Sequence, residues 1–246
     1  MNAPLTKDIF LAIAFFIYPF LLLMVSKGLE ASGARKDLSR KFVHAAMGLV
    51  ILFVPFFDRL WVAIIPPIVF AAVNMLDYKF SLFPQIRGED EANVGTILYP
   101  ISYAILILIF FHKDFWGLAV LGILAMAFGD AGASVIGRAY GKTTYTVDGE
   151  TRSVVGSTVM FVVTFIIALI VFAAYGPRMG LTLEYMSVYA AGFIMAGVAT
   201  AVEALSTRGS DNLTVPVLTA LAGWALVAVL HGNVLGSQTI VNQPLF

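Results

Sequence analysis

The chain has 246 residues, of which 60% are hydrophobic and 12% are charged, and its formal net charge is zero. Soluble domains are about 45–50% apolar and about 25% charged, so this composition, with a mean hydropathy of +0.91, is typical of an integral membrane protein. The balanced charge gives no reason to expect a nucleic-acid partner. The absence of cysteine excludes disulfides, thiolate metal sites and a cysteine nucleophile. We expect a single membrane-embedded domain over residues 1–246.

Eight apolar stretches are long enough, or nearly long enough, to cross about 30 Å of hydrocarbon. They predict an all-α integral membrane protein with about eight transmembrane helices. Pro66-Pro67 predicts a kink or break in the third stretch, and the tight turn at Asp58-Arg59 predicts that the second and third pair as a helical hairpin. The stretches are residues 9–26, 42–57, 60–76, 94–111, 115–136, 154–175, 185–202 and 213–230.

Lysine and arginine are concentrated in one set of alternate loops, which holds eleven of the fifteen. The other four are Lys7, Arg59, Lys113 and Arg178. Because cytoplasmic loops carry the excess of these residues, we expect the richer loops to be cytoplasmic and both termini to lie outside. The same loops hold most of the remaining polar residues. We therefore expect an active site on the cytoplasmic face, in the cell membrane.

The loop after the fifth stretch predicts a small cytoplasmic β-hairpin between the fifth and sixth helices. β-Prone residues 143–147 and 150–154 flank Asp148-Gly149, and both turn residues tolerate positive φ. An ordered turn without a ligand is the alternative.

Asp130 follows fifteen mostly apolar residues. An acid at such a depth costs roughly 2.5–3.5 kcal/mol on insertion scales, so it usually faces protein or water and has a function. Glycines at 129, 132, 137 and 141 leave room for a close backbone or a ligand. These residues predict a polar site at the end of the fifth helix.

Cationic residues that could hold phosphate oxygens open the second helix. Arg40 and His44 share a helix face, and Lys41 lies close to it. Anchoring at the membrane surface is the alternative. Residues 137–143 are similar to a phosphate-binding P-loop, but Ile136 stands where that motif requires glycine, so they are not one.

The start of the sixth helix and three acids complete the predicted site. Arg152-Ser153 opens the sixth helix, where free N–H groups favour an anion and Ser153 can also act as the N-cap. Asp130, Glu203 and Asp211 could meet in space, and carboxylates together with phosphate are the usual ligands of Mg²⁺. The acids of residues 87–93 fit either a site or helix capping.

These motifs resemble the CTP-dependent polyprenol kinases: the phytol, farnesol and geranylgeraniol kinases and the catalytic region of dolichol kinase. They are more distantly similar to phosphatidate cytidylyltransferases. The resemblance covers residues 39–216 in the expected order, but Arg152 and Val155 stand where the family has Lys and Glu. The motifs are Ser39-Arg40-Lys41-x-x-His44, Glu91-x-Asn93-x-Gly95-Thr-Ile-Leu-Tyr99-Pro100, Gly129-Asp130-x-x-Ala133-Ser134-x-x-Gly137-x-x-x-Gly141-Lys142, Ser153-x-x-Gly156-Ser157 and Glu203-Ala-Leu-Ser-x-Arg-Gly-x-Asp211-Asn212-x-x-x-Pro216.

The resemblance implies that the protein phosphorylates an isoprenoid alcohol with CTP and Mg²⁺ and releases the prenyl monophosphate and CDP. Asp130 would bind the metal, helped by Glu203 or Asp211, and Glu91 or His44 would act as the base. The nucleotide and its phosphates would be held by Arg40, Lys41, Asn93, Ala133, Ser134, Gly137, Arg138, Gly141, Lys142, Arg152, Ser153, Gly156, Ser157 and Asn212.

Two alternatives remain at this point. One is a cytidylyltransferase that makes a CDP-linked lipid. The other is a secondary transporter, because intramembrane acids and broken helices also mark transporters. No inverted repeat is visible in the sequence, which disfavours the transporter.

Overall fold

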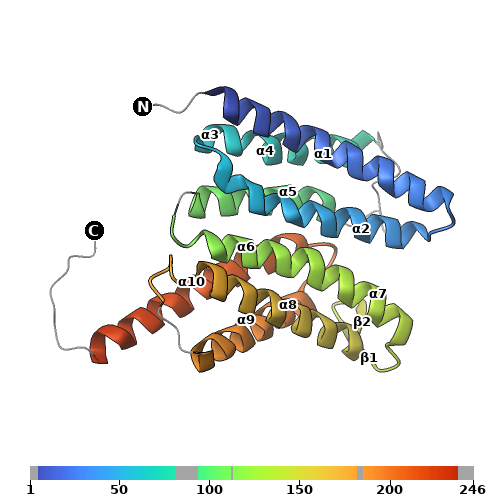
Figure 1. The fold of residues 1–246 in the computed structure, drawn as a ribbon. Helices are drawn as coiled ribbons and strands as arrows, with labels where there is room; N and C mark the ends of the chain where they lie inside the picture. Colours follow the sequence, from blue (N-terminus) through green and yellow to red (C-terminus); the bar gives the residue numbers. More distant parts are fainter. Residues whose placement is uncertain (1–4, 81–93, 112, 182–184, 238–246) are drawn as a thin grey trace.

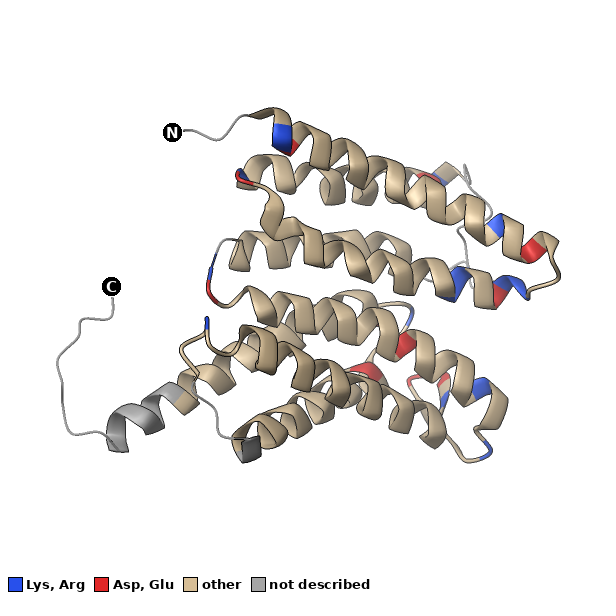
Figure 2. Ribbon diagram, in the orientation of Figure 1, with Lys and Arg blue, Asp and Glu red and all other residues tan. Residues whose placement is uncertain are grey.

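The computed structural model describes residues 5–80, 94–111, 113–181 and 185–237. Within these residues, seven helices are long and apolar enough to cross a membrane, and α5 (Gly95–Phe110) is an eighth, shorter apolar helix. The predicted all-α membrane fold is therefore confirmed. Charged residues gather at the two ends of the helices, and the middle of the bundle is almost free of them (Figure 2).

The first half of the chain forms the upper layers of the bundle in Figure 1. There α1 (Leu5–Ala31) packs on α2 (Lys36–Gly48), while α4 (Ile65–Phe80) packs on α5 and α1. The predicted pairing of the second and third stretches as a hairpin is therefore wrong. The second stretch packs on α1, and the third packs on α5 and α1, rather than on each other.

Prolines shape both of these stretches. The second continues from α2 as a 3-10 helix, η1 (Leu49–Phe56), which contains Pro55. The third is divided at Ile64 into α3 (Leu60–Ala63) and α4. The break lies just before Pro66-Pro67, which fall in the first turn of α4. A proline has no N–H to donate to the carbonyl four residues earlier and clashes with it, so α3 cannot continue through these positions. The predicted break is confirmed.

One long helix runs through the centre of the molecule, from Trp116 to Tyr140. It consists of α6 (Trp116–Leu124), η2 (Ala125–Asp130) and α7 (Ala131–Tyr140). More than half of its most apolar 18-residue stretch is buried, a larger share than for any other membrane-length helix within the described residues.

The last three helices pack against this central helix, and the first two of them lie below it in Figure 1. α8 (Val154–Tyr175) lies against α6, η2 and α7, and α9 (Tyr185–Leu205) packs on α8. α10 (Asp211–Ser237) contacts α5, α6 and α9. The N-terminal ends of α8 and α10 thus lie near the end of the central helix that carries Asp130.

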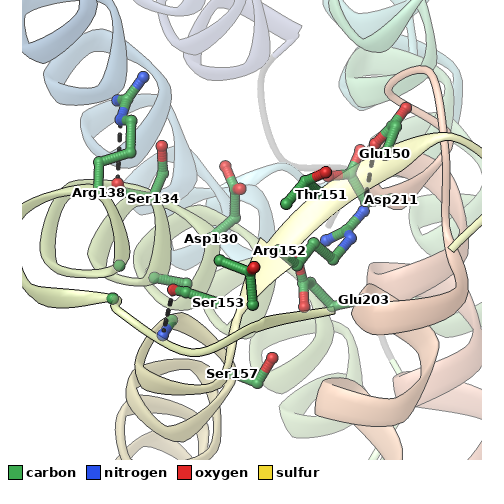
Figure 3. Close-up of a pocket in the computed structure, with 15 residues that line it drawn as sticks. Asp130, Ser134, Arg138, Glu150, Thr151, Arg152, Ser153, Ser157, Glu203 and Asp211 are labelled. Carbon is green, nitrogen blue, oxygen red and sulfur yellow. Dashed lines mark hydrogen bonds and ion pairs between the residues drawn. The ribbon is translucent and has the colours of Figure 1, made fainter. Parts of the chain in front are cut away.

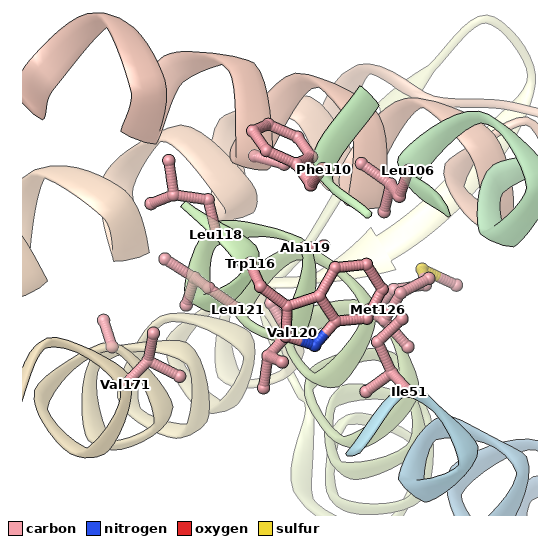
Figure 4. Packing of buried hydrophobic residues seen from close by; sticks show 14 of the residues in the cluster. Ile51, Leu106, Phe110, Trp116, Leu118, Ala119, Val120, Leu121, Met126 and Val171 are labelled. Atoms are coloured by element: carbon pink, nitrogen blue, oxygen red, sulfur yellow. The ribbon is translucent and has the colours of Figure 1, made fainter. Parts of the chain in front are cut away.

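The core surrounds α6, as Figure 4 shows for Leu118, Leu121 and Met126, none of which is exposed. Because lipid is as apolar as these side chains, helices in a membrane associate through close packing rather than through the hydrophobic effect. Gly122 illustrates this contact: a Cβ at that position would lie 2.2 Å from the carbonyl oxygen of Pro216 on α10.

Polar contacts fasten the opposite end of the bundle. Asp8 is fully buried and accepts hydrogen bonds from the Asp58 backbone N–H (2.9 Å) and from the Arg59 guanidinium (3.2 Å). Lys7 pairs with Asp58 at 2.7 Å. These contacts tie the start of α1 to the turn before α3.

Candidate active site

The site begins where the central helix changes its winding. Residues Ala125–Asp130 form a π-helical turn, a feature that is frequent at functional sites. Gly129 permits this turn to lie against α8, because a Cβ there would be 2.4 Å from the Met160 sulfur. The turn ends at Asp130, whose carboxylate is directed into a cavity (Figure 3).

Asp130 has a charged partner on another helix. Its carboxylate forms an ion pair with the ammonium of Lys41 on α2. The two side chains are only 14% and 20% exposed. A charge buried to this degree requires such a partner, because an uncompensated one would cost several kcal/mol. Arg138 on α7 forms a second link to α2 through Asp37, at 3.1 Å.

Small residues bring α7 and α8 together at the cavity. A Cβ on Gly137 would lie 2.7 Å from the Ser153 hydroxyl and 3.0 Å from the Cα of Gly156, so only glycine fits between these elements. Ser153 is the N-cap of α8 and accepts a hydrogen bond from the Gly156 N–H at 3.0 Å. The N-terminus of α8, which favours an anion, therefore opens into the cavity.

The predicted β-hairpin is present between α7 and α8. β1 (Thr144–Val147) pairs with β2 (Glu150–Ser153) in antiparallel register, with Val147 opposite Glu150. The turn residues Asp148 and Gly149 have φ of 47° and 84°, as a two-residue turn of this kind requires. The Tyr145 hydroxyl lies 2.6 Å from that of Ser157 and ties the hairpin to α8.

The ends of α9 and α10 form the remaining wall. Glu203, near the end of α9, forms an ion pair with Arg152 of β2. Asp211 opens α10, and its carboxylate accepts hydrogen bonds from the backbone (2.9 Å) and side-chain amide (3.0 Å) of Asn212. Asn212 therefore orients Asp211 rather than lining the cavity itself.

The resulting cavity measures about 430 Å³ and draws its walls from the central helix, the hairpin, and the ends of α8, α9 and α10 (Figure 3). It brings together twelve of the predicted residues: Asp130, Ala133, Ser134, Gly137, Arg138, Gly141, Arg152, Ser153, Gly156, Ser157, Glu203 and Asp211. The sequence analysis missed Thr144, Glu150 and Thr151, which also line it. The sequence signal for these residues was the pair of β-prone segments around Asp148-Gly149, because a hairpin at the site brings strand residues to it as well as the turn.

The other predicted residues are placed differently. Arg40, Lys41, His44 and Lys142 do not line the cavity, although Lys41 reaches Asp130 from outside it. His44 stacks on Tyr99 with ring centroids 4.3 Å apart. Its buried Nε2 has no hydrogen-bond partner within the described part of the chain. Glu91 and Asn93 lie outside the described residues.

The donor set suits a magnesium ion only in company with phosphates. Across residues 5–80, 94–111, 113–181 and 185–237, no three His, Asp or Glu side chains are grouped closely enough to hold a metal ion by themselves. Mg²⁺ ordinarily takes one or two carboxylates and completes its shell with water and substrate phosphate. Asp130 and Asp211, which line the same cavity, fit that requirement.

Two named proteins are similar to this chain over most of its length. A phytol kinase of Synechocystis sp. is 32% identical over 190 residues, with 77% of this chain and 79% of that protein covered. A protein of Glycine max named "Probable phytol kinase 1, chloroplastic" is 29% identical over 205 residues, with 75% of this chain and 65% of that protein covered. No protein-family model and no solved structure matches the chain. The chain belongs to the phytol kinase family.

Proposed function

We propose that this protein transfers the γ-phosphoryl group of CTP to the hydroxyl of an isoprenoid alcohol at the cytoplasmic face of the membrane. One observation carries the proposal: a buried acid, Asp130, ends a π-helical turn and faces a polar cavity at one end of a bundle of membrane-length helices. The named relatives are phytol kinases, which supports an isoprenoid alcohol as the acceptor.

The cavity offers what phosphoryl transfer needs, since this reaction depends mainly on positioning and on neutralising charge. The N–H groups at the start of α8 and the hydroxyls of Ser153 and Ser157 would hold phosphate oxygens. Arg138 and Lys41, at its edge, would add positive charge. Asp130, with Asp211, would hold Mg²⁺, which when bound neutralises charge on the nucleotide phosphates.

In the reaction, a bond forms between the alcohol oxygen and the γ-phosphorus, and the bond from that phosphorus to the bridging oxygen of CDP breaks. The hydroxyl proton passes to a base. His44 does not line the cavity and stacks on Tyr99, which leaves Glu91 as the better of the two predicted bases. The isoprenoid tail would remain between apolar helices, with its hydroxyl at the cavity.

The experiment is a product analysis with the purified protein, Mg²⁺ and phytol or geranylgeraniol. CTP labelled in its γ-phosphate should give a labelled prenyl monophosphate and unlabelled CDP, and ATP, GTP or UTP should give much less product. Release of pyrophosphate with formation of a CDP-lipid would identify a cytidylyltransferase instead. Absence of any labelled lipid with all four nucleotides would contradict the proposal.

A further inference from the structure

Arg152 fastens the β-hairpin to the end of α9. Its guanidinium forms an ion pair with Glu203, donates to the backbone carbonyl of Ser206, and lies 3.6 Å from the Glu150 carboxylate. A planar guanidinium that meets several acceptors at once holds their relative positions more rigidly than a lysine ammonium on its flexible stem. Figure 3 shows Arg152 and Glu203 together at the cavity wall.

The ion pair between Arg152 and Glu203 is largely buried. The side chains of Arg152 and Glu203 are 14% and 8% exposed. The Arg152 Nε is buried without a hydrogen-bond partner within the described residues. The terminal nitrogens of the guanidinium already bind acceptors of this chain, so they are not free to turn toward a ligand. Breaking such a pair by removing one partner leaves an uncompensated buried charge.

A second set of contacts, made by Glu150 and Arg208, lies beside the first. The other carboxylate oxygen of Glu150 accepts a hydrogen bond from the backbone N–H of Arg208, and the carbonyl of Arg208 accepts one from the Val94 N–H at 3.2 Å. Arg208 has a φ of 52°, a conformation that costs energy in a residue other than glycine. The hairpin thus holds the loop between α9 and α10, and that loop contacts the start of α5.

We propose that Glu203 is a positioning residue, which acts through Arg152 to hold β2 and Ser153 at the cavity wall, and not a magnesium ligand. A divalent cation at Glu203 would lie next to the guanidinium and be repelled by it. Asp130 differs from Glu203 in its partner. The Lys41 ammonium sits on a flexible stem and makes a single contact with Asp130, so it can move aside for a cation. The inference rests on the proposed function only in taking the cavity as the nucleotide site.

The test compares Glu203→Gln with Asp211→Asn, a matched removal of one carboxylate charge from the same cavity. Glu203→Gln should weaken CTP binding about tenfold, the scale expected for coupled neighbours. It should leave unchanged the Mg²⁺ concentration that gives half-maximal activity. Asp211→Asn should raise that Mg²⁺ concentration. If Glu203→Gln raises it as much as Asp211→Asn does, Glu203 is a metal ligand. If CTP affinity does not change, Glu203 does not position the site.

A second measurement does not depend on the nucleotide. The melting temperatures of Arg152→Met, Glu203→Gln and the double variant form a double-mutant cycle, and the double variant should lose much less than the two single losses together. Additive losses would show that the two side chains do not act as a pair. Should Glu203→Gln fail to fold, Glu203→Asp, which keeps the charge on a shorter side chain, takes its place in the cycle with Arg152→Met. If wild-type protein binds no CTP, the proposed function fails, and the cycle still decides whether the pair exists.

Discussion

The ammonium of Lys41 on α2 pairs with the carboxylate of Asp130 at the end of the π-helical turn, 89 residues further along the chain. This contact joins the upper helices of Figure 1 to the central helix at the cavity. It places a movable positive charge on the carboxylate that we propose as a metal ligand. Lys41 and a divalent cation should therefore compete for Asp130.

Lys41→Met should have opposite effects on stability and on metal binding. Loss of the counter-charge should lower the melting temperature by about 5 °C or more, because Asp130 would be left unpaired. Mg²⁺ alone should then raise the melting temperature of the variant more than that of the wild type. Lys36→Met, which removes an exposed charge from the first turn of the same helix, should change neither. An equal response to Mg²⁺ in Lys41→Met and the wild type would show that no competition occurs.

Gly149→Val should weaken nucleotide binding. Valine resists the φ of 84° that the turn requires, and the strands on either side of the turn supply Thr144 and Thr151 to the cavity. Isothermal titration should show a loss of about tenfold in CTP affinity, equal to about 1.4 kcal/mol. Gly33→Val is the control, because Gly33 also has a positive φ, 96°, but lies in the loop between α1 and α2. Equal effects of the two substitutions would leave the hairpin without a role in binding.

Gly122→Ala should destabilise the protein. The added Cβ would lie 2.2 Å from the Pro216 carbonyl oxygen, so α6 and α10 would have to separate. Because α10 begins with Asp211, activity should fall as well. Gly197→Ala on α9, where a Cβ would meet nothing within 4 Å, should be neutral or stabilising, because alanine favours a helix over glycine by about 1 kcal/mol. Thermal unfolding in detergent compares the two, and an equal melting temperature for both variants would contradict the close contact.

The sidedness of the cavity can be measured directly, because the chain has no cysteine to remove. Single cysteines at the exposed positions Ser32 and Thr146 should react with a membrane-impermeant maleimide only in inside-out vesicles. A cysteine at the exposed Arg178 should react only in intact cells. Labelling of Thr146 from outside would place the hairpin and the cavity on the other face of the membrane.

The sequence predicted the apolar spans, the break before Pro66 and the hairpin turn, because each depends on residues that are close together in the chain. It did not predict which helices pack together, since contacts such as that of Gly122 with Pro216 depend on the final arrangement of α6 and α10. The π-helical turn before Asp130 was missed for the same reason.

The residues that line the cavity were largely predictable from the sequence, whereas the ion pairs of their charged side chains were not. Motif residues from the central helix, β2, α8, α9 and α10 do line one cavity. The partners of the charged side chains were missed: Arg152 reaches Glu203, and Lys41 reaches Asp130, across long separations in sequence. Such pairs follow from tertiary packing, which residue types and spacing do not specify.

The central claim is that Asp130 supports transfer of the γ-phosphoryl group of CTP to an isoprenoid alcohol. Its most direct test is the initial rate of labelled prenyl monophosphate formation by Asp130→Asn, with normal elution in size-exclusion chromatography as the check on folding. We predict a loss of at least about 100-fold, or about 2.7 kcal/mol of transition-state stabilisation. Asp114→Asn, an exposed acid just before the start of α6, should retain the wild-type rate. Turnover near the wild-type rate by a normally eluting Asp130→Asn variant would contradict the account.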